Sequence, residues 1–136
     1  MRDPLPDLPG YALRRAANAT AAELSARLAT LELRQAEASV LMLVDANPAT
    51  TASALGRALD IQRANMVPLL KRLEDAGLIV RTPIDGKSQG LELTPAGRDR
   101  MQAARAVIDS FEREMLGRIP AEHRAHLLPA LNALWR

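Results

Sequence analysis

The chain has 136 residues and a mass of 14.8 kDa, which suits one domain with one hydrophobic core. Hydrophobic residues make up 48% of it and aromatic residues only 2%, so the core must be aliphatic, a composition that favours helices packed on helices. The absence of cysteine excludes disulfides, thiolate zinc sites and cysteine nucleophiles, and a formal net charge of +2 permits nucleic-acid binding without requiring it.

The first ten residues predict an extended or irregular segment, because they contain Pro4, Pro6 and Pro9. They also lack the apolar core of a signal peptide. The longest apolar runs, such as Val40 to Val44, fall far short of the roughly 20 residues that cross a membrane. We therefore expect a soluble cytoplasmic protein that does not contact membranes.

Two helices are predicted next, over residues 11–33 and 35–46. In the first, leucines recur at spacings of four and three residues among many alanines, at Leu24, Leu28 and Leu31. The second should stop at Asn47, because the residue before a proline is disfavoured in the helical conformation.

A helix-turn-helix pair is predicted from Thr50 to Gly77. Thr50 or Thr51 can cap a short first helix by accepting a backbone N–H. Residues 60–61 form the turn, and a second helix over residues 62–76 ends at Gly77, which tolerates the left-handed conformation of a helix stop.

A β-hairpin is predicted after this pair. Strands over residues 78–82 and 91–93 are joined by a polar loop over residues 83–90 that contains an Asp-Gly turn signal. Thr94 and Pro95 then provide the N-cap and the first residue of a long helix.

The long helix from Pro95, which ends before Pro120, carries an apolar seam. Its members alternate spacings of three and four residues: Met101, Ala104, Ile108, Phe111 and Met115. Such a seam offers a packing surface to another helix. A sixth helix from about Ala121, bent or restarted at Pro129, supplies further apolar side chains, namely Leu127, Leu128, Leu131, Leu134 and Trp135.

The order of these elements and three stretches of sequence resemble the MarR family of bacterial regulators. The stretches are residues 10–15 (GYALRR), residues 73–81 (LEDAGLIVR), and residues 85–88 (DGKS) followed by 91–97 (LELTPAG). The resemblance covers nearly the whole chain. It implies a mainly α winged helix-turn-helix domain with six helices, a two-stranded antiparallel wing and an obligate-type helical dimer interface.

This resemblance also implies how the single domain, residues 1–136, is organised and what it does. Residues 35–94 would form the DNA-binding lobe, and residues 10–33 and 95–136 the dimerisation helices. The expected function is that of a sequence-specific transcriptional regulator, a repressor that binds an inverted-repeat operator in double-stranded DNA as a homodimer.

Base reading is expected from the N-terminal residues of the second helix of the pair, which enter the major groove. Arg63 suits a guanine edge, Gln62 or Asn65 suits adenine, and Met66 suits a thymine methyl group. The alternatives are that Gln62 merely caps the helix and that Met66 belongs to the core. Pro68 has no N–H and therefore predicts a kink or a late start in this helix.

Phosphate contacts are expected beside the reading residues. Lys71 and Arg72 lie later in the same helix, although Lys71 fits a solvated helix face beside acidic residues equally well. Hydroxyl groups at the start of the first helix can hold a phosphate or simply cap the helix, and these belong to Thr50, Thr51 and Ser53.

In the wing, Lys87 and Arg81 supply positive charge near a minor groove, with Ser88 and Gln89 as secondary donors. The family usually has arginine where this chain has Lys87, and lysine keeps the charge but loses the bidentate geometry. The resemblance implies that Asp85 orients the basic residue through an ion pair, while the local pattern equally fits an ordinary Asp-Gly turn.

For the dimer interface, the seam of the long helix contributes Ile108, Phe111 and Met115. The resemblance adds residues of the first and last helices, each of which could instead be intrachain core: Tyr11, Leu13, Leu127, Leu131 and Trp135. It also implies a small aromatic or anionic effector, with Tyr11, Arg14 and Arg15 lining its site, although a pair of surface arginines is commonly just solvated. No cofactor is expected.

Two other function classes compete with this interpretation. His123 and His126 lie beside Glu122, but the chain offers no third metal ligand, nucleophile–base set or glycine-rich phosphate loop, so we expect neither a metal site nor an enzyme. The second competing class is a winged-helix module that mediates protein association with weak or no specific DNA binding. Val67, Pro68 and the reduced wing charge favour it.

Overall fold

The computed structural model describes residues 1–136 and contains six α-helices and one two-stranded sheet. In chain order the elements are α1 (Pro9–Ala29), α2 (Gln35–Ala46), α3 (Ala52–Leu59), α4 (Arg63–Asp75), β1 (Ile79–Pro83), β2 (Gln89–Leu93), α5 (Pro95–Gly117) and α6 (Arg124–Asn132), with short 3-10 turns at Leu5–Asp7 and Ala121–His123. The predicted order of six helices and a hairpin is confirmed.

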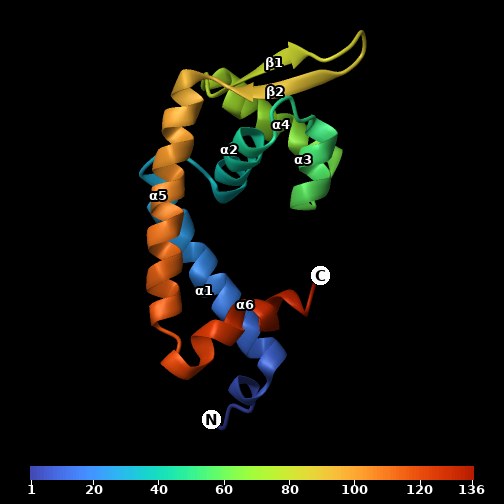
Figure 1. Ribbon diagram of the computed structural model, residues 1–136. Coiled ribbons are helices and arrows are strands. Elements are labelled where there is room, and N and C mark those ends of the chain that lie inside the picture. The colour runs from blue at the N-terminus through green and yellow to red at the C-terminus, as the bar shows by residue number, and fades with distance from the viewer.

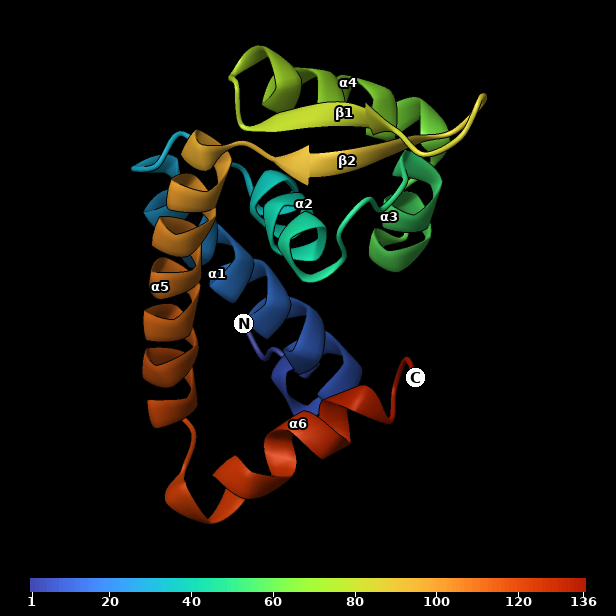
Figure 2. The ribbon, with the colours of Figure 1, turned by 45° about the horizontal axis from the view of Figure 1, so that its top comes forward.

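A compact lobe contains α2, α3, α4 and the β1–β2 hairpin, and the long helices α1 and α5 extend away from it (Figure 1). At the far end, α6 lies beside the N-terminal part of α1 (Figure 2). None of the helices is both long and apolar enough to cross a membrane.

The central helix of the lobe is α2, and it has the predicted bounds. Its N-terminus is closed by a capping box in which the backbone N–H of Arg34 donates to a carboxylate oxygen of Glu37 at 2.9 Å. Asn47 ends it before the proline. Its buried residues are the apolar Ala38, Val40, Leu41 and Val44 together with Glu37.

The predicted helix-turn-helix pair is formed by α3 and α4. Thr51 caps α3 by accepting a backbone N–H three residues later at 3.1 Å, and Asp60 ends α3 in the left-handed conformation, with φ 52°. The late start predicted from Pro68 is wrong, because α4 begins at Arg63 and continues through Pro68. The ring is tolerated on the exposed face, where water can satisfy the carbonyl of Ala64 that the proline leaves unpaired.

The exit from β2 fastens the antiparallel hairpin to the end of α4. Gly77 ends α4 with φ 73°, and the hydroxyl of Thr94 donates to the Gly77 carbonyl at 2.6 Å while accepting the N–H of Gly97 at 2.9 Å. Gly97 lies so close to Leu78 that a Cβ would be 1.9 Å from the Leu78 carbonyl oxygen. The Thr-x-x-Gly exit therefore joins α5 to the lobe.

Element boundaries differ from the predictions at a few ends. The first helix begins at Pro9, as a proline at the first helical position allows, and ends at Ala29 rather than residue 33. Glu32, with φ 57°, helps to reverse the chain there. Strand β2 begins at Gln89, two residues early, because it pairs with Pro83 of β1.

The apolar seam of α5 packs against its own chain. Ala104 and Phe111 are buried, and Met101 and Ile108 pack against the core of the lobe. The opposing surfaces belong to α1 and α2. The prediction that Phe111 is a dimer contact is therefore wrong, and Ile108 packs largely against its own chain. A helix of the same molecule can meet this seam as well as a second copy can, because the periodicity is the same. Met115 is half-buried.

A charged network braces α1 against the end of α5. Two guanidinium N–H groups of Arg118 donate to the Glu23 carboxylate at 2.7 and 2.8 Å, and Arg27 pairs with both Glu23 and Glu114. The Arg27 guanidinium also lies 5.6 Å from the centre of the Phe111 ring. The hydrogen bonds from Arg118 lower the pKa of Glu23 to about 2.

No residue of α6 is buried within the chain. Trp135, just beyond it, is 75% exposed, which contradicts the alternative that it is intrachain core. Leu127 and Leu131 are half-buried. The exposed apolar residues at this end come from the two chain termini and both long helices: Leu5, Leu8, Leu13, Leu116, Leu128, Leu134 and Trp135.

Candidate nucleic-acid interface

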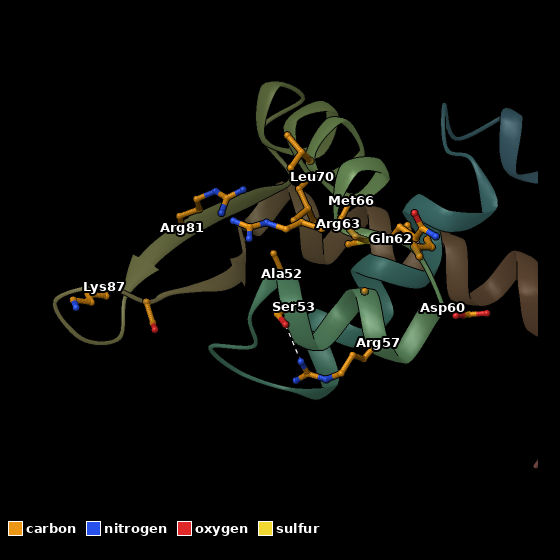
Figure 3. Close-up of a pocket in the computed structure, with 14 residues that line it drawn as sticks. Ala52, Ser53, Arg57, Asp60, Gln62, Arg63, Met66, Leu70, Arg81 and Lys87 are labelled. Carbon is orange, nitrogen blue, oxygen red and sulfur yellow. Dashed lines mark hydrogen bonds between the residues drawn. The ribbon is translucent and has the colours of Figure 1, made fainter.

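A basic hollow of about 730 Å³ lies between α3, α4 and the wing, the wing being residues 79–93. Its cationic lining residues are Arg57 of α3, Arg63 of α4, and Arg81 and Lys87 of the wing, and the side chains of Arg63 and Arg81 point toward each other (Figure 3). A second hollow of about 560 Å³ continues toward the wing loop and shares with the first Ala52, Ser53, Arg81, Lys87 and Ser88. The residues that line either hollow are called the basic surface below.

Along α3, the basic surface includes Thr51, Ser53 and Arg57. The guanidinium of Arg57 donates to the hydroxyl of Ser53 one turn earlier, at 2.8 Å. Arg57 is a cation that the sequence interpretation did not single out. The sequence feature that could have identified Arg57 is its position four residues after Ser53, on the helix face opposite the buried Leu55.

At the start of α4, Gln62 occupies the N-cap position, yet its side chain makes no capping hydrogen bond and remains available. Arg63 is exposed and is the one basic residue of α4 without a carboxylate partner. The prediction that Met66 contacts a thymine methyl group is wrong. Met66 is only 2% exposed and lies at the bottom of the hollow, so it cannot reach a base. The alternative that Met66 belongs to the core is correct.

Lys71 and Arg72 do not join the basic surface. Lys71 pairs with Asp75 at 2.9 Å on the exposed face of α4, as its alternative interpretation held. Arg72 lies 3.6 Å from the carboxylate of Glu37, which is 3% exposed. Arg72 thus neutralises a buried charge of the lobe, and both residues are engaged away from the hollow.

Asp85 organises the wing loop, but not through an ion pair. Its carboxylate accepts the backbone N–H groups of Lys87 at 2.9 Å and Ser88 at 2.7 Å. These hydrogen bonds lower the pKa of Asp85 below its usual value. The expected ion pair is wrong because the aspartate closes a local turn, and it orients Lys87 through the backbone.

Arg81 is placed by a partner on α4. Its Nε lies 2.6 Å from the Glu74 carboxylate, and the rest of its guanidinium faces the hollow toward Arg63 (Figure 3). Of the remaining predicted residues, Gln89 lines the second hollow, while Asn65 is exposed but lines neither. Thr50 lines neither hollow, and its backbone carbonyl accepts the N–H of Leu91 at 2.7 Å, which joins the start of α3 to β2.

The residues predicted to bind an effector cluster near the start of α1. Arg15 donates to the Tyr11 hydroxyl at 2.9 Å, and the guanidinium groups of Arg14 and Arg15 lie 5.3 and 5.7 Å from the ring centre. This cluster belongs to neither hollow. It is therefore separate from the basic surface.

A model of the MarR family matches residues 31–88 of this chain. A solved structure of the transcriptional repressor CouR bound to a 23-mer DNA duplex is 35% identical in sequence, covers 97% of this chain and 95% of its own, and superposes with a TM-score of 0.87. The chain belongs to the MarR family. All residues of the larger hollow lie within the segment that the MarR family model matches.

Two further MarR-like structures contain small molecules. CouR bound to p-coumaroyl-CoA is 33% identical, covers 100% of this chain and 97% of its own, and has a TM-score of 0.89. The MarR family protein Rv2887 of Mycobacterium tuberculosis, in complex with salicylic acid, is 29% identical, covers 93% of this chain and 96% of its own, and has a TM-score of 0.74. This chain is thus a winged helix-turn-helix member of a family of transcriptional regulators.

Proposed function

We propose that this protein is a homodimeric transcriptional repressor that binds an inverted-repeat operator through its basic surface and is released by a small aromatic or anionic effector. The observation that carries the proposal is that Arg57, Arg63, Arg81 and Lys87 all line one hollow, while the other basic residues of α4 are paired with carboxylates. It acts as a cytoplasmic regulator without enzymatic activity.

The division of labour within the surface follows from where each cation lies. Arg63 and Gln62, at the open N-terminus of α4, are suited to base edges in the major groove. Arg57 on α3 and Lys87 on the wing lie on either side and suit backbone phosphates or the adjacent minor groove. Residues 35–94 would therefore act as the DNA-binding lobe.

Dimerisation would use residues 10–33 and 95–136. The support is that α6, which lies beside the start of α1 (Figure 2), buries none of its residues within the chain, and that Leu128, Leu134 and Trp135 are exposed. An inverted repeat needs two α4 helices in a fixed relation about one DNA turn apart, which a second copy on this apolar end would supply.

The effector would have an aromatic or anionic group. This rests on the similarity to CouR with p-coumaroyl-CoA and to Rv2887 with salicylic acid. Within this chain, Tyr11 with Arg14 and Arg15 offers an aromatic ring and two cations at the dimerisation end. We propose this cluster as part of the effector site.

The function is tested by titrating labelled DNA from upstream of the chain's own gene at two salt concentrations, followed by fluorescence anisotropy. A steep salt dependence, together with a strong preference over scrambled DNA, would support the repressor. Arg63→Ala should abolish the preference, whereas Lys71→Ala, on the same helix but paired with Asp75 outside the basic surface, should retain it. Weak binding without sequence preference would instead favour a protein-interaction module.

A further inference from the structure

The inference concerns Val67, which is 59% exposed and lines the larger hollow. It lies four residues after Arg63, so the two side chains share one face of α4 in successive turns. Val67 is not among the hydrophobic residues that form the core or pack against it, and a β-branched side chain is not favoured by helix propensity. Its position beside the reading residue points to a contact outside the chain.

The second turn of α4 offers this hollow only apolar groups. Besides Gln62 and Arg63, the α4 residues that line it are Met66, Val67 and Leu70, and of these three only Val67 is exposed. Lys71, one turn after Val67, lines neither hollow and is paired with Asp75. Beyond its first turn, α4 therefore cannot read bases through this hollow by hydrogen bonding.

In the major groove, the apolar group on a natural base edge is the C5-methyl of thymine. We infer that Val67 is a specificity-determining residue that packs against the methyl group of one thymine in each half-site, beside the guanine bound by Arg63. The inference rests on the proposed operator binding. It also transfers the thymine-reading role from the buried Met66 to its exposed neighbour.

The helix geometry sets where this thymine should lie. Four residues of α-helix rise about 6 Å, and base pairs are stacked about 3.4 Å apart, so the thymine is expected within about two base pairs of the guanine. A contact of one methyl group with one isopropyl group contributes about a fourfold change in affinity per half-site.

The test replaces the thymines of the operator one at a time with deoxyuridine, which lacks only the methyl group, and measures the affinity by fluorescence anisotropy. For the unaltered protein, uracil at the contacted position should weaken binding about fourfold per half-site. Val67→Ala should bind the thymine and uracil duplexes equally. Val80→Ala, a 45% exposed valine on β1 outside the basic surface, should discriminate like the unaltered protein.

Each other result counts against the inference. Operator-specific binding in which no single methyl group matters would overturn it and leave the proposed function standing. The same holds if Val67→Ala still distinguishes thymine from uracil. If the unaltered protein binds operator and scrambled duplexes alike, the proposed function fails and the inference fails with it.

Discussion

Arg81 of β1 and Glu74 of α4 are joined by an ion pair with an Nε–Oε1 distance of 2.6 Å. Glu74 therefore links the wing to the helix that carries Arg63, and it neutralises part of the charge of the basic surface. One carboxylate thus both positions a cation of the basic surface and reduces the positive charge that this cation can offer to a phosphate.

Replacement of Glu74 by glutamine should separate these two effects. We expect Glu74→Gln to increase the affinity for random DNA severalfold at low salt, because Arg81 is no longer neutralised, and to reduce the preference for the operator. Competition titrations with operator and scrambled duplexes measure both. Asp75→Asn makes the same charge change next to Lys71, outside the basic surface, and should alter the preference less. Equal effects of the two variants would contradict a specific role for Glu74.

The contribution of the wing loop to operator affinity should depend on Asp85 as strongly as on Lys87. Asp85→Ala removes the acceptor of two backbone N–H groups, and we expect it to lower operator affinity at least as much as Lys87→Ala, about tenfold. Asp85→Asn keeps an acceptor oxygen and should lose less. Because the pKa of Asp85 is lowered in the folded chain, the carboxylate stays charged at neutral pH, and its effect is lost only as the pH falls through that lowered pKa. Retention of full affinity in Asp85→Ala would show that the turn does not position Lys87.

Gly97 is predicted to be irreplaceable for stability. A Cβ at this position would lie 1.9 Å from the Leu78 carbonyl oxygen, so Gly97→Ala must displace α5 from the lobe and should cost about 3 kcal/mol of unfolding free energy. Gly117→Ala, at the other end of the same helix, meets no atom within 4 Å and should leave stability unchanged or slightly higher. Urea unfolding followed by circular dichroism gives both values. A mild effect at Gly97 would mean that the exit of β2 is not the rigid joint described above.

The Glu23–Arg118 pair should make stability sensitive to acid. The pKa of Glu23 is about 2 in the folded chain and 4.5 normally, so its contribution is complete above pH 4.5 and is lost as the pH falls toward 2. Thermal midpoints measured across this range should therefore fall less in Glu23→Gln, which has already lost the pair at neutral pH. Glu112→Gln removes an α5 carboxylate that has no ion pair, and its pH profile should match that of the unaltered protein. Identical profiles for both variants would exclude Glu23 as the acid-sensitive group.

Trp135 provides a direct report on dimerisation, because it is the only tryptophan and is 75% exposed in the single chain. If a second copy covers this end, its fluorescence emission should be blue-shifted in the dimer and move to longer wavelength on dilution. Leu128→Glu should give a monomer by sedimentation velocity, with red-shifted emission at all concentrations and weakened operator binding. If the emission maximum does not change with concentration although the protein is shown to dimerise, the interface does not include Trp135.

Local signals in the sequence were sufficient for most of the fold. Asn47 before proline, the left-handed Gly77 and the Thr94–Pro95 helix start lie at the observed boundaries, because capping and backbone restrictions act over a few neighbouring residues. Arg63, Arg81 and Lys87, which the sequence predicts to contact DNA, all line the larger hollow, since the pattern of helix-turn-helix and wing places them on one side, and their contact with DNA stays a prediction.

The partners of each face were decided only by the tertiary structure. A step of one residue turns a helix by about 100°, and this step separates the buried Met66 from the exposed Val67, which composition cannot distinguish. The seam of α5 has the same period whether it packs on α1 of its own chain or on a second copy, so Phe111 could be assigned only once the packing was known. Likewise, Arg72 and Arg57 are both arginines on exposed helix faces, and only the three-dimensional arrangement shows that the first meets Glu37 while the second meets the hollow. Periodicity determines which residues share a face, but the free energy of burial and of charge pairing depends on what lies opposite that face.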